Sequence, residues 1–218
     1  MIITMNGRYG CGSRLIAAKA AKLLGYRLCD DEIVLETVKN MDVDMSEEAF
    51  RYYDESTGTA DVREIKRQSS VDRNRQGIFS IISGLQNDVP PLDKSLSKVV
   101  RQVIDKLAED GNCILFGRGT NSYLRSRPDA VHFFVTSAFD KRVNYLCQLH
   151  PEVERADMEK LVTRTDKRRE EYCYFFSGER WDDPEHYDLV IKTELLHPDG
   201  WAEIVRDIVT VREKVLKA

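Results

Sequence analysis

Short apolar runs alternate along the chain with longer segments in which apolar residues recur at helical spacing. The runs cover residues 2–5, 26–29, 113–116, 131–135 and 189–191. All but the second are apolar at nearly every position, which is typical of parallel strands that helices cover on both faces. The alternation predicts an α/β fold built around a parallel sheet.

Three of the intervening segments have a clear helical pattern. In residues 13–24, Ile16, Ala20 and Leu23 fall on one face, and Gly25 stands where a helix commonly ends. A second helix is predicted over residues 93–109 from apolar positions spaced i, i+3, i+4: Leu96, Val99, Val100, Val103, Ile104 and Leu107. A third helix is predicted toward residue 218. We expect one apolar face of this helix to pack against the sheet and so complete the domain: Trp201, Ile204, Val205, Ile208, Val211 and Val215.

Two stretches depart from this pattern. Residues 42–88 carry mixed charges with little apolar periodicity, and we expect them to form an appended subdomain within a single domain of 218 residues. Residues 164–183 combine a basic cluster with aromatic side chains and the turn Asp182-Asp183-Pro184. Both stretches are candidates for segments that meet a ligand.

Composition and charge exclude several classes of protein. The chain has 33 Lys and Arg against 37 Asp and Glu, so bulk charge gives no argument for binding nucleic acid. Five cysteines without a C-x-x-C pair and four scattered histidines favour free thiols over a disulfide framework or a zinc site. No apolar run approaches the roughly 18 residues that cross a bilayer, and the N-terminus does not resemble a secretory signal. We therefore expect a cytoplasmic protein that makes no use of a membrane.

The clearest candidate for chemistry is a glycine-rich turn between the first strand and the first helix. Gly7, Gly10 and Gly12 let backbone N–H groups turn toward an anion, and the helix N-terminus adds its positive dipole end. In the phosphate-loop pattern G-x-x-x-x-G-K-[ST], Gly7 and Gly12 match, while Ser13 and Arg14 replace the Lys and the Ser or Thr. The turn predicts phosphate binding, and a glycine turn without a ligand is the alternative.

A dinucleotide site is a second interpretation of the same turn. Gly10 and Gly12 match the pattern G-x-G-x-x-G, and Asp30 follows at roughly the 20-residue distance of a ribose contact. Leu15 replaces the third glycine. A nicotinamide-dependent enzyme would require this second interpretation.

Arginines mark two further candidate sites. Arg118 lies between two glycines after the run at 113–116, and open α/β sheets bind ligands at the carboxyl ends of their strands. An anionic substrate is one partner for Arg118, and a carboxylate of the protein is the alternative. A basic cluster on one predicted helix forms either a solvated face or a lid that neutralises phosphates: Arg164, Lys167, Arg168 and Arg169.

These segments together resemble the cytidylate kinase-like proteins, relatives of cytidylate kinase among the P-loop nucleoside monophosphate kinases. The resemblance spans nearly the whole chain and is poorest over residues 42–88. The segments that carry it are Tyr9-Gly10-Cys11-Gly12-Ser13-Arg14, Cys29-Asp30-Asp31-Glu32, Phe116-Gly117-Arg118-Gly119, Leu124-Arg125-Ser126-Arg127-Pro128, Asp166-Lys167-Arg168-Arg169-Glu170-Glu171-Tyr172, Trp181-Asp182-Asp183-Pro184 and Tyr187-Asp188-Leu189-Val190-Ile191.

The resemblance implies a three-layer P-loop kinase fold with a five-stranded parallel sheet. It also implies a helical acceptor-binding insert over residues 42–88 and an arginine-rich lid over residues 160–183. The implied reaction moves the γ-phosphoryl group of ATP to CMP, dCMP or a related small acceptor, with Mg²⁺ bridging the phosphates. The implied partners are small nucleotides. A homodimer is suggested separately by the apolar stretch at 78–85, which is either an interface strip or a buried helix or strand.

The resemblance assigns roles residue by residue. The donor phosphates would be held by the glycine turn: Gly7, Gly10, Cys11, Gly12, Ser13 and Arg14. Arg118 would bind the acceptor phosphate, Arg142 would reach the same site, and Asp30 would face the acceptor or a Mg²⁺-bound water. Arg168 and Arg169 would stabilise the transferring group.

The missing loop lysine keeps an alternative function open. One such contact is commonly worth about 10²-fold in rate. Arg14 is a candidate substitute for its charge, and the Ser13 hydroxyl is the candidate Mg²⁺ ligand. The alternative is a catalytically impaired nucleotide-binding module that signals nucleotide state to a partner.

Overall fold

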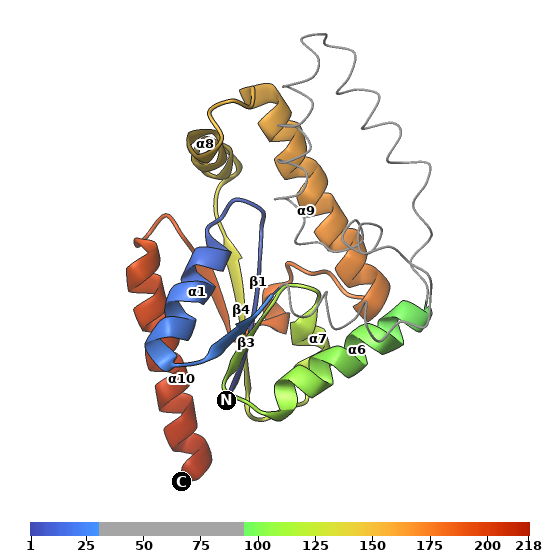
Figure 1. Cartoon of the computed structure of the whole chain (residues 1–218), viewed down its shortest axis with the longest axis vertical. Helices are drawn as coiled ribbons and strands as arrows, with labels where there is room; N and C mark the ends of the chain where they lie inside the picture. Colours follow the sequence, from blue (N-terminus) through green and yellow to red (C-terminus); the bar gives the residue numbers. More distant parts are fainter. Residues whose placement is uncertain (31–93) are drawn as a thin grey trace.

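The computed structural model describes residues 1–30 and 94–218 (Figure 1). The acceptor-binding insert expected over residues 42–88 lies outside the described residues, as does the apolar strip at 78–85 that suggested a dimer interface. The described part holds the sheet, the glycine turn and all of the segment expected to form a lid.

The sheet is parallel, has five strands, and follows the order β2-β3-β1-β4-β5. Its strands are β1 (Ile2–Gly7), β2 (Arg27–Cys29), β3 (Cys113–Phe116), β4 (Ala130–Thr136) and β5 (Leu189–Lys192). In the centre, Ile3 stands opposite Ile114 on β3 and Val131 on β4. The predicted strands are confirmed, and their carboxyl ends meet at one edge, where the glycine turn begins.

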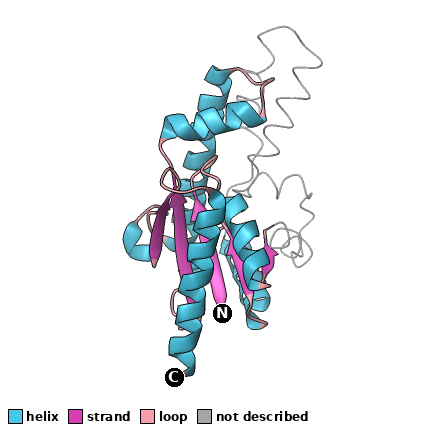
Figure 2. Cartoon of the chain, turned by 90° about the vertical axis from the view of Figure 1, so that its left-hand side faces the viewer, coloured by secondary structure: helices cyan, strands magenta, loops and turns pink. Residues whose placement is uncertain are grey.

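Helices cover both faces of the sheet (Figures 1 and 2). Helices α1 (Ser13–Leu24) and α10 (Pro198–Lys217) pack together on one face, and α6 (Lys94–Glu109) with the short α7 (Thr120–Leu124) lies on the other. The buried side chains of Ile16, Ala20 and Trp201 join those of the central strands in one core. Val100, Val103 and Ile104 of α6 anchor a second core on the opposite face. The three-layer arrangement is as expected.

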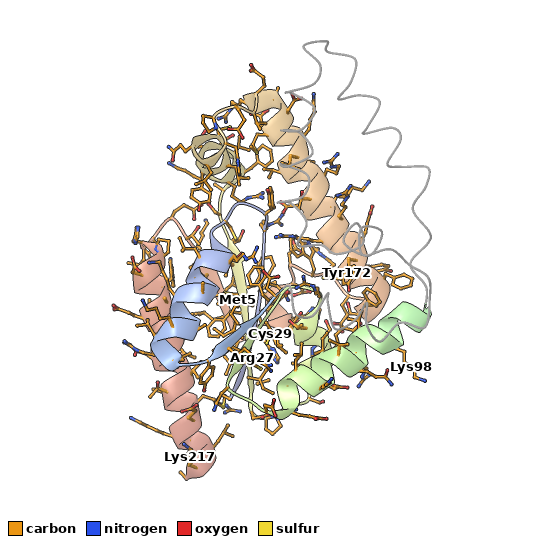
Figure 3. The ribbon with its side chains drawn as sticks, viewed as in Figure 1. Met5, Arg27, Cys29, Lys98, Tyr172 and Lys217 are labelled. Atoms are coloured by element: carbon orange, nitrogen blue, oxygen red, sulfur yellow. The ribbon has the colours of Figure 1, made fainter. Side chains whose placement is uncertain are left out.

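Two helices stand beyond the carboxyl edge of the sheet. Helix α8 (Phe139–Leu149) and the 23-residue helix α9 (Arg155–Ser177) pack against each other there. Figure 2 shows them above the strand ends. Tyr172, labelled in Figure 3, lies in a buried aromatic cluster with Phe134 of β4 and Trp181. The C-terminal part of helix α9 is therefore packed at this aromatic cluster.

Helix α10 covers the sheet with only its first half. Trp201 and Val205 are buried, whereas Val211 and Val215 are each 59% exposed. Twenty residues of helix extend about 30 Å, which is longer than the sheet, and Figure 3 shows the end at Lys217 well away from the strands. The expectation that the whole apolar face closes the domain is therefore wrong for its C-terminal part.

No helix within residues 1–30 and 94–218 is long and apolar enough to cross a membrane.

A histidine is buried inside the sheet. His132 of β4 stands opposite Thr4 of β1, and its Nδ1 lies 2.8 Å from the Thr4 hydroxyl oxygen. Its Nε2 is buried without a hydrogen-bond partner among the described residues. Burial lowers the pKa of His132, and the charge of Asp188 only partly opposes this effect.

We expect His132 to make the protein less stable as the pH falls. Its folded pKa lies below the ordinary value of 6.5, so the unfolded chain binds more protons between these two values. The free energy of unfolding should fall below pH 6.5 by up to about 1.4 kcal/mol per pH unit from this group. Urea unfolding at pH 7.5 and 5.5 measures the loss, which His132→Gln should reduce and His197→Gln, at an exposed position, should not. An unchanged loss in His132→Gln would contradict this assignment.

Candidate phosphate-binding site

The glycine turn folds tightly between β1 and α1. Gly10 and Gly12 have left-handed backbone angles, with φ of 77° and 82°. A Cβ atom at Gly10 would lie 2.7 Å from Leu146 Cδ1 of α8, and one at Gly7 would lie 2.8 Å from the carbonyl oxygen of Val135. Glycine is therefore required at position 10 by angle and by space, and at position 7 by space.

Helix α1 presents its N-terminus at this turn. It begins at Ser13 after Gly12, which has no side chain to cap it. The first-turn N–H groups of a helix have no intrahelical acceptors, and together with the dipole they attract an anion. The turn and the helix end thus form a cradle suited to phosphate oxygens.

Helices α8 and α9 clamp the turn at Tyr9. The Tyr9 N–H donates to Asp166 Oδ1 at 2.8 Å, and its carbonyl accepts from Arg142 Nη1 at 2.8 Å. Arg142 Nη1 also lies 2.7 Å from Asp166 Oδ2, while its Nε donates to the carbonyl of Ser137. Arg142 is buried at 4% exposed, whereas Asp166 is 13% exposed, so the ion pair is largely shielded from solvent. The backbone N–H and the carbonyl of Tyr9 are therefore both held by the Arg142–Asp166 pair.

One more arginine contacts the turn from α9, and an arginine of the turn itself reaches beyond it. Arg169 Nη1 donates to the carbonyl of Gly7 at 2.5 Å, and its guanidinium lies over the Tyr9 ring at 5.6 Å. Arg8 pairs with Asp182 at 2.8 Å and lies over the Trp181 ring at 5.7 Å. The segment that follows α9 is thereby joined to the turn.

A second charged cluster lies at the carboxyl ends of β2 and β3. Arg118 Nη1 lies 3.0 Å from Asp30 Oδ1, and Arg14 Nε lies 2.9 Å from Asp30 Oδ2. Arg118 and Asp30 are 2% and 4% exposed. Arg118 has a positive φ of 57° between two glycines that also have positive φ, which turns its side chain back onto the carbonyl of Phe116. A carboxylate partner for Arg118, one of the two alternatives from the sequence, is present.

The structure divides the predicted site residues into two groups. Around the turn it brings together Gly7, Gly10, Cys11, Gly12, Ser13, Arg142 and Arg169. At the neighbouring strand ends it brings together Asp30, Arg14 and Arg118. Arg168 lies one residue before Arg169, about 100° away around α9, and is partly buried.

The individual loop side chains have distinct environments. Cys11 is buried and its thiol donates to the carbonyl of Val135, and burial raises the pKa of this thiol, so it packs as a neutral group. Ser13 is also buried. Asp30 engages two arginines, which occupies the carboxylate that a dinucleotide ribose would need.

The predicted Mg²⁺ ligand is a single hydroxyl, that of Ser13. No group of three His, Cys, Asp or Glu side chains in residues 1–30 and 94–218 could hold a metal ion. The Ser13 hydroxyl is an oxygen ligand of the kind Mg²⁺ accepts, and it stands beside the cradle, at 3.0 Å from a Cβ built on Gly7. The site therefore fits an ion that the phosphates carry in.

Sequence reasoning missed Asp166 as a site residue. Its spacing of three from Arg169 places both side chains on one face of α9, and this is the signal that could have found it. Arg8 and Trp181 were likewise not predicted to meet, because their contact depends on the path of the chain after α9.

Solved structures of other proteins have the same fold as this chain. An uncharacterized protein from Eubacterium ventriosum is similar with a TM-score of 0.66 at 16% identity, over 97% of this chain and 98% of that chain. Shikimate kinase from Bacteroides thetaiotaomicron is similar with a TM-score of 0.50 at 10% identity, over 96% and 98%. The fold is that of the P-loop kinases.

Comparison with sequences gives the family. No curated protein matches the chain. The sequence model of the cytidylate kinase-like family matches residues 2–195, which include the glycine turn, both charged clusters and α9. The chain belongs to the cytidylate kinase-like family.

Proposed function

We propose that the protein transfers the γ-phosphoryl group of Mg²⁺-bound ATP to CMP, dCMP or a related small acceptor. The observation that carries this proposal is the cradle at residues 7–13, which ends on an uncapped helix and is contacted by Arg142 and Arg169 from α8 and α9. Phosphoryl transfer needs little covalent chemistry from a protein, because positioning and positive charge supply most of the acceleration. The cradle offers both.

The donor phosphates would lie on the backbone of Gly10, Gly12 and Ser13. Their N–H groups and the α1 dipole would neutralise part of the phosphate charge, and the Ser13 hydroxyl would ligate Mg²⁺. An ion held there would supply positive charge that offsets the charge of the phosphates.

The acceptor would approach the cluster at β2 and β3. Arg118 is 2% exposed and held by Asp30, so its proposed contact with the acceptor phosphate requires this pair to rearrange. Arg14, with half of its side chain exposed, is already accessible there. Asp30 would set the position of both guanidinium groups.

A coupled ADP-release assay tests the proposal. Purified protein with ATP and Mg²⁺ is assayed against CMP, dCMP, UMP, AMP and GMP, and we expect turnover that depends on a cytidine acceptor. Arg14→Ala should reduce this turnover, while Arg127→Ala, which removes an exposed pair with Asp129, should leave it unchanged. Acceptor-independent ADP release, or none, would contradict the proposal.

Ser13 in the lysine position favours a second candidate, a nucleotide sensor. Such a module would bind ATP at the same cradle and report its presence to a partner through α9. Calorimetric binding of ATP combined with no turnover on any acceptor would support the sensor over the kinase.

A further inference from the structure

Arg169 brings a positive charge from α9 to the first glycine of the turn. Its Nη1 donates to the Gly7 carbonyl at 2.5 Å, its guanidinium lies 5.6 Å from the centre of the Tyr9 ring, and the residue is 7% exposed. A hydrogen bond to a carbonyl and an aromatic face hold a guanidinium in one orientation. The charge is therefore fixed against the loop.

The residue in the lysine position approaches the same glycine. A Cβ atom at Gly7 would lie 2.9 Å from Ser13 Cβ and 3.0 Å from Ser13 Oγ. Ser13 and Arg169 thus both contact Gly7, one by its short side chain and the other by its guanidinium. Ser13 carries no charge at the position where the pattern has a lysine, and the charged guanidinium of Arg169 lies next to it.

Arg14 does not fill this role. Its Nε lies 2.9 Å from Asp30 Oδ2 at the end of β2. A residue one position after Ser13 points about 100° further around α1. The expectation that Arg14 replaces the lysine is therefore not supported by its contacts.

The charge of Arg169 also acts on Cys11, at the centre of the loop. Burial raises the pKa of the Cys11 thiol, and hydrogen bonds with Ser13, followed by the charges of Arg169 and Arg142, oppose that rise. Arg142 is itself paired with Asp166 at 2.7 Å. Both arginines thus bring positive charge near Cys11.

We propose that Arg169 is the cation of this phosphate loop, and that it supplies from α9 the charge that a lysine supplies in the pattern G-x-x-x-x-G-K-[ST]. The inference deepens the proposed function and rests on it. It makes polyphosphate binding depend on α9 lying against the turn, so α9 is part of the donor site as well as a cover over it.

A rescue experiment tests this assignment. The variants are Arg169→Gln, Ser13→Lys and the two combined, with Arg155→Gln as the control because Arg155 is 49% exposed and pairs with Glu159 on the same helix. The measurements are calorimetric affinity for inorganic tripolyphosphate and for ATP, melting temperature, and kcat and KM with the best acceptor. Arg169→Gln should lower kcat/KM by about 10²-fold and weaken tripolyphosphate binding. Adding Ser13→Lys should restore most of both.

The outcomes separate this inference from the function. If the wild type turns over and Arg169→Gln is as active as Arg155→Gln, or if Ser13→Lys fails to restore a loss in Arg169→Gln, the role of Arg169 is overturned while the kinase stands. Tripolyphosphate binding that follows the rescue pattern without turnover supports Arg169 and overturns the kinase. No tripolyphosphate binding by the wild type overturns both. A folding defect in Arg169→Gln would appear in the melting temperature, and a lysine at position 13 would not repair it.

Discussion

Asp30→Ala is expected to lower the free energy of unfolding by about 3–5 kcal/mol, because it leaves the buried charge of Arg118 without its carboxylate. Arg118 is 2% exposed, and its Nη1 lies 3.0 Å from Asp30. A guanidinium stays protonated at any pH at which the protein is folded, so the cost of its unpaired buried charge remains. Urea unfolding at neutral pH measures the change.

Two controls separate this pair from ordinary surface charges. Arg127→Ala breaks an exposed pair with Asp129 and should cost about 1 kcal/mol or less. Combining Asp30→Ala with Arg118→Met removes both buried charges and should recover much of the loss. A loss of under 1 kcal/mol in Asp30→Ala would show that water reaches Arg118 and that the cluster is not closed.

Asp166→Ala is expected to loosen the glycine turn and lower kcat/KM by about 10²-fold, the scale of a small misplacement of catalytic groups. It removes the acceptor of the Tyr9 N–H and the partner of the buried Arg142 together. Hydrogen exchange of peptides that cover residues 8–12 should become faster. Asp166→Asn retains an oxygen for the Tyr9 N–H and should have a smaller effect.

The matched control for Asp166 is Glu171→Ala on the same helix. Glu171 is 62% exposed and pairs with Lys167, away from the turn. Its loss should leave hydrogen exchange in the turn and the rate of turnover unchanged. Unchanged exchange at residues 8–12 in Asp166→Ala would contradict the clamp.

The strands and the first helices could be predicted because their signals are local. The glycine at position 25 and the apolar spacing of residues 100–107 depend only on nearby sequence, and the structure matches them. How much of α10 packs on the sheet could not be predicted, because whether Val211 contacts the sheet depends on the length of strands elsewhere in the chain.

The site was predictable in its residue types and less so in its pairings. The sequence pattern alone indicates the turn and the position of Arg118 at a strand end, where a ligand and a protein carboxylate were both possible partners. Only the family resemblance pointed to Arg142 and Arg169 individually. The partners could not be predicted: Arg118 meets Asp30 across 88 positions, and Arg142 meets Asp166 only because α8 packs on α9. Partner choice among many similar charges is set by packing, which periodicity does not specify.

Phosphorus NMR of the wild-type protein with ATP, Mg²⁺ and CMP identifies where the γ-phosphoryl group goes. We predict that ADP and CDP accumulate together in equal amounts. Resonances of ADP and inorganic phosphate without CDP, or ATP and CMP that stay unchanged, would contradict it.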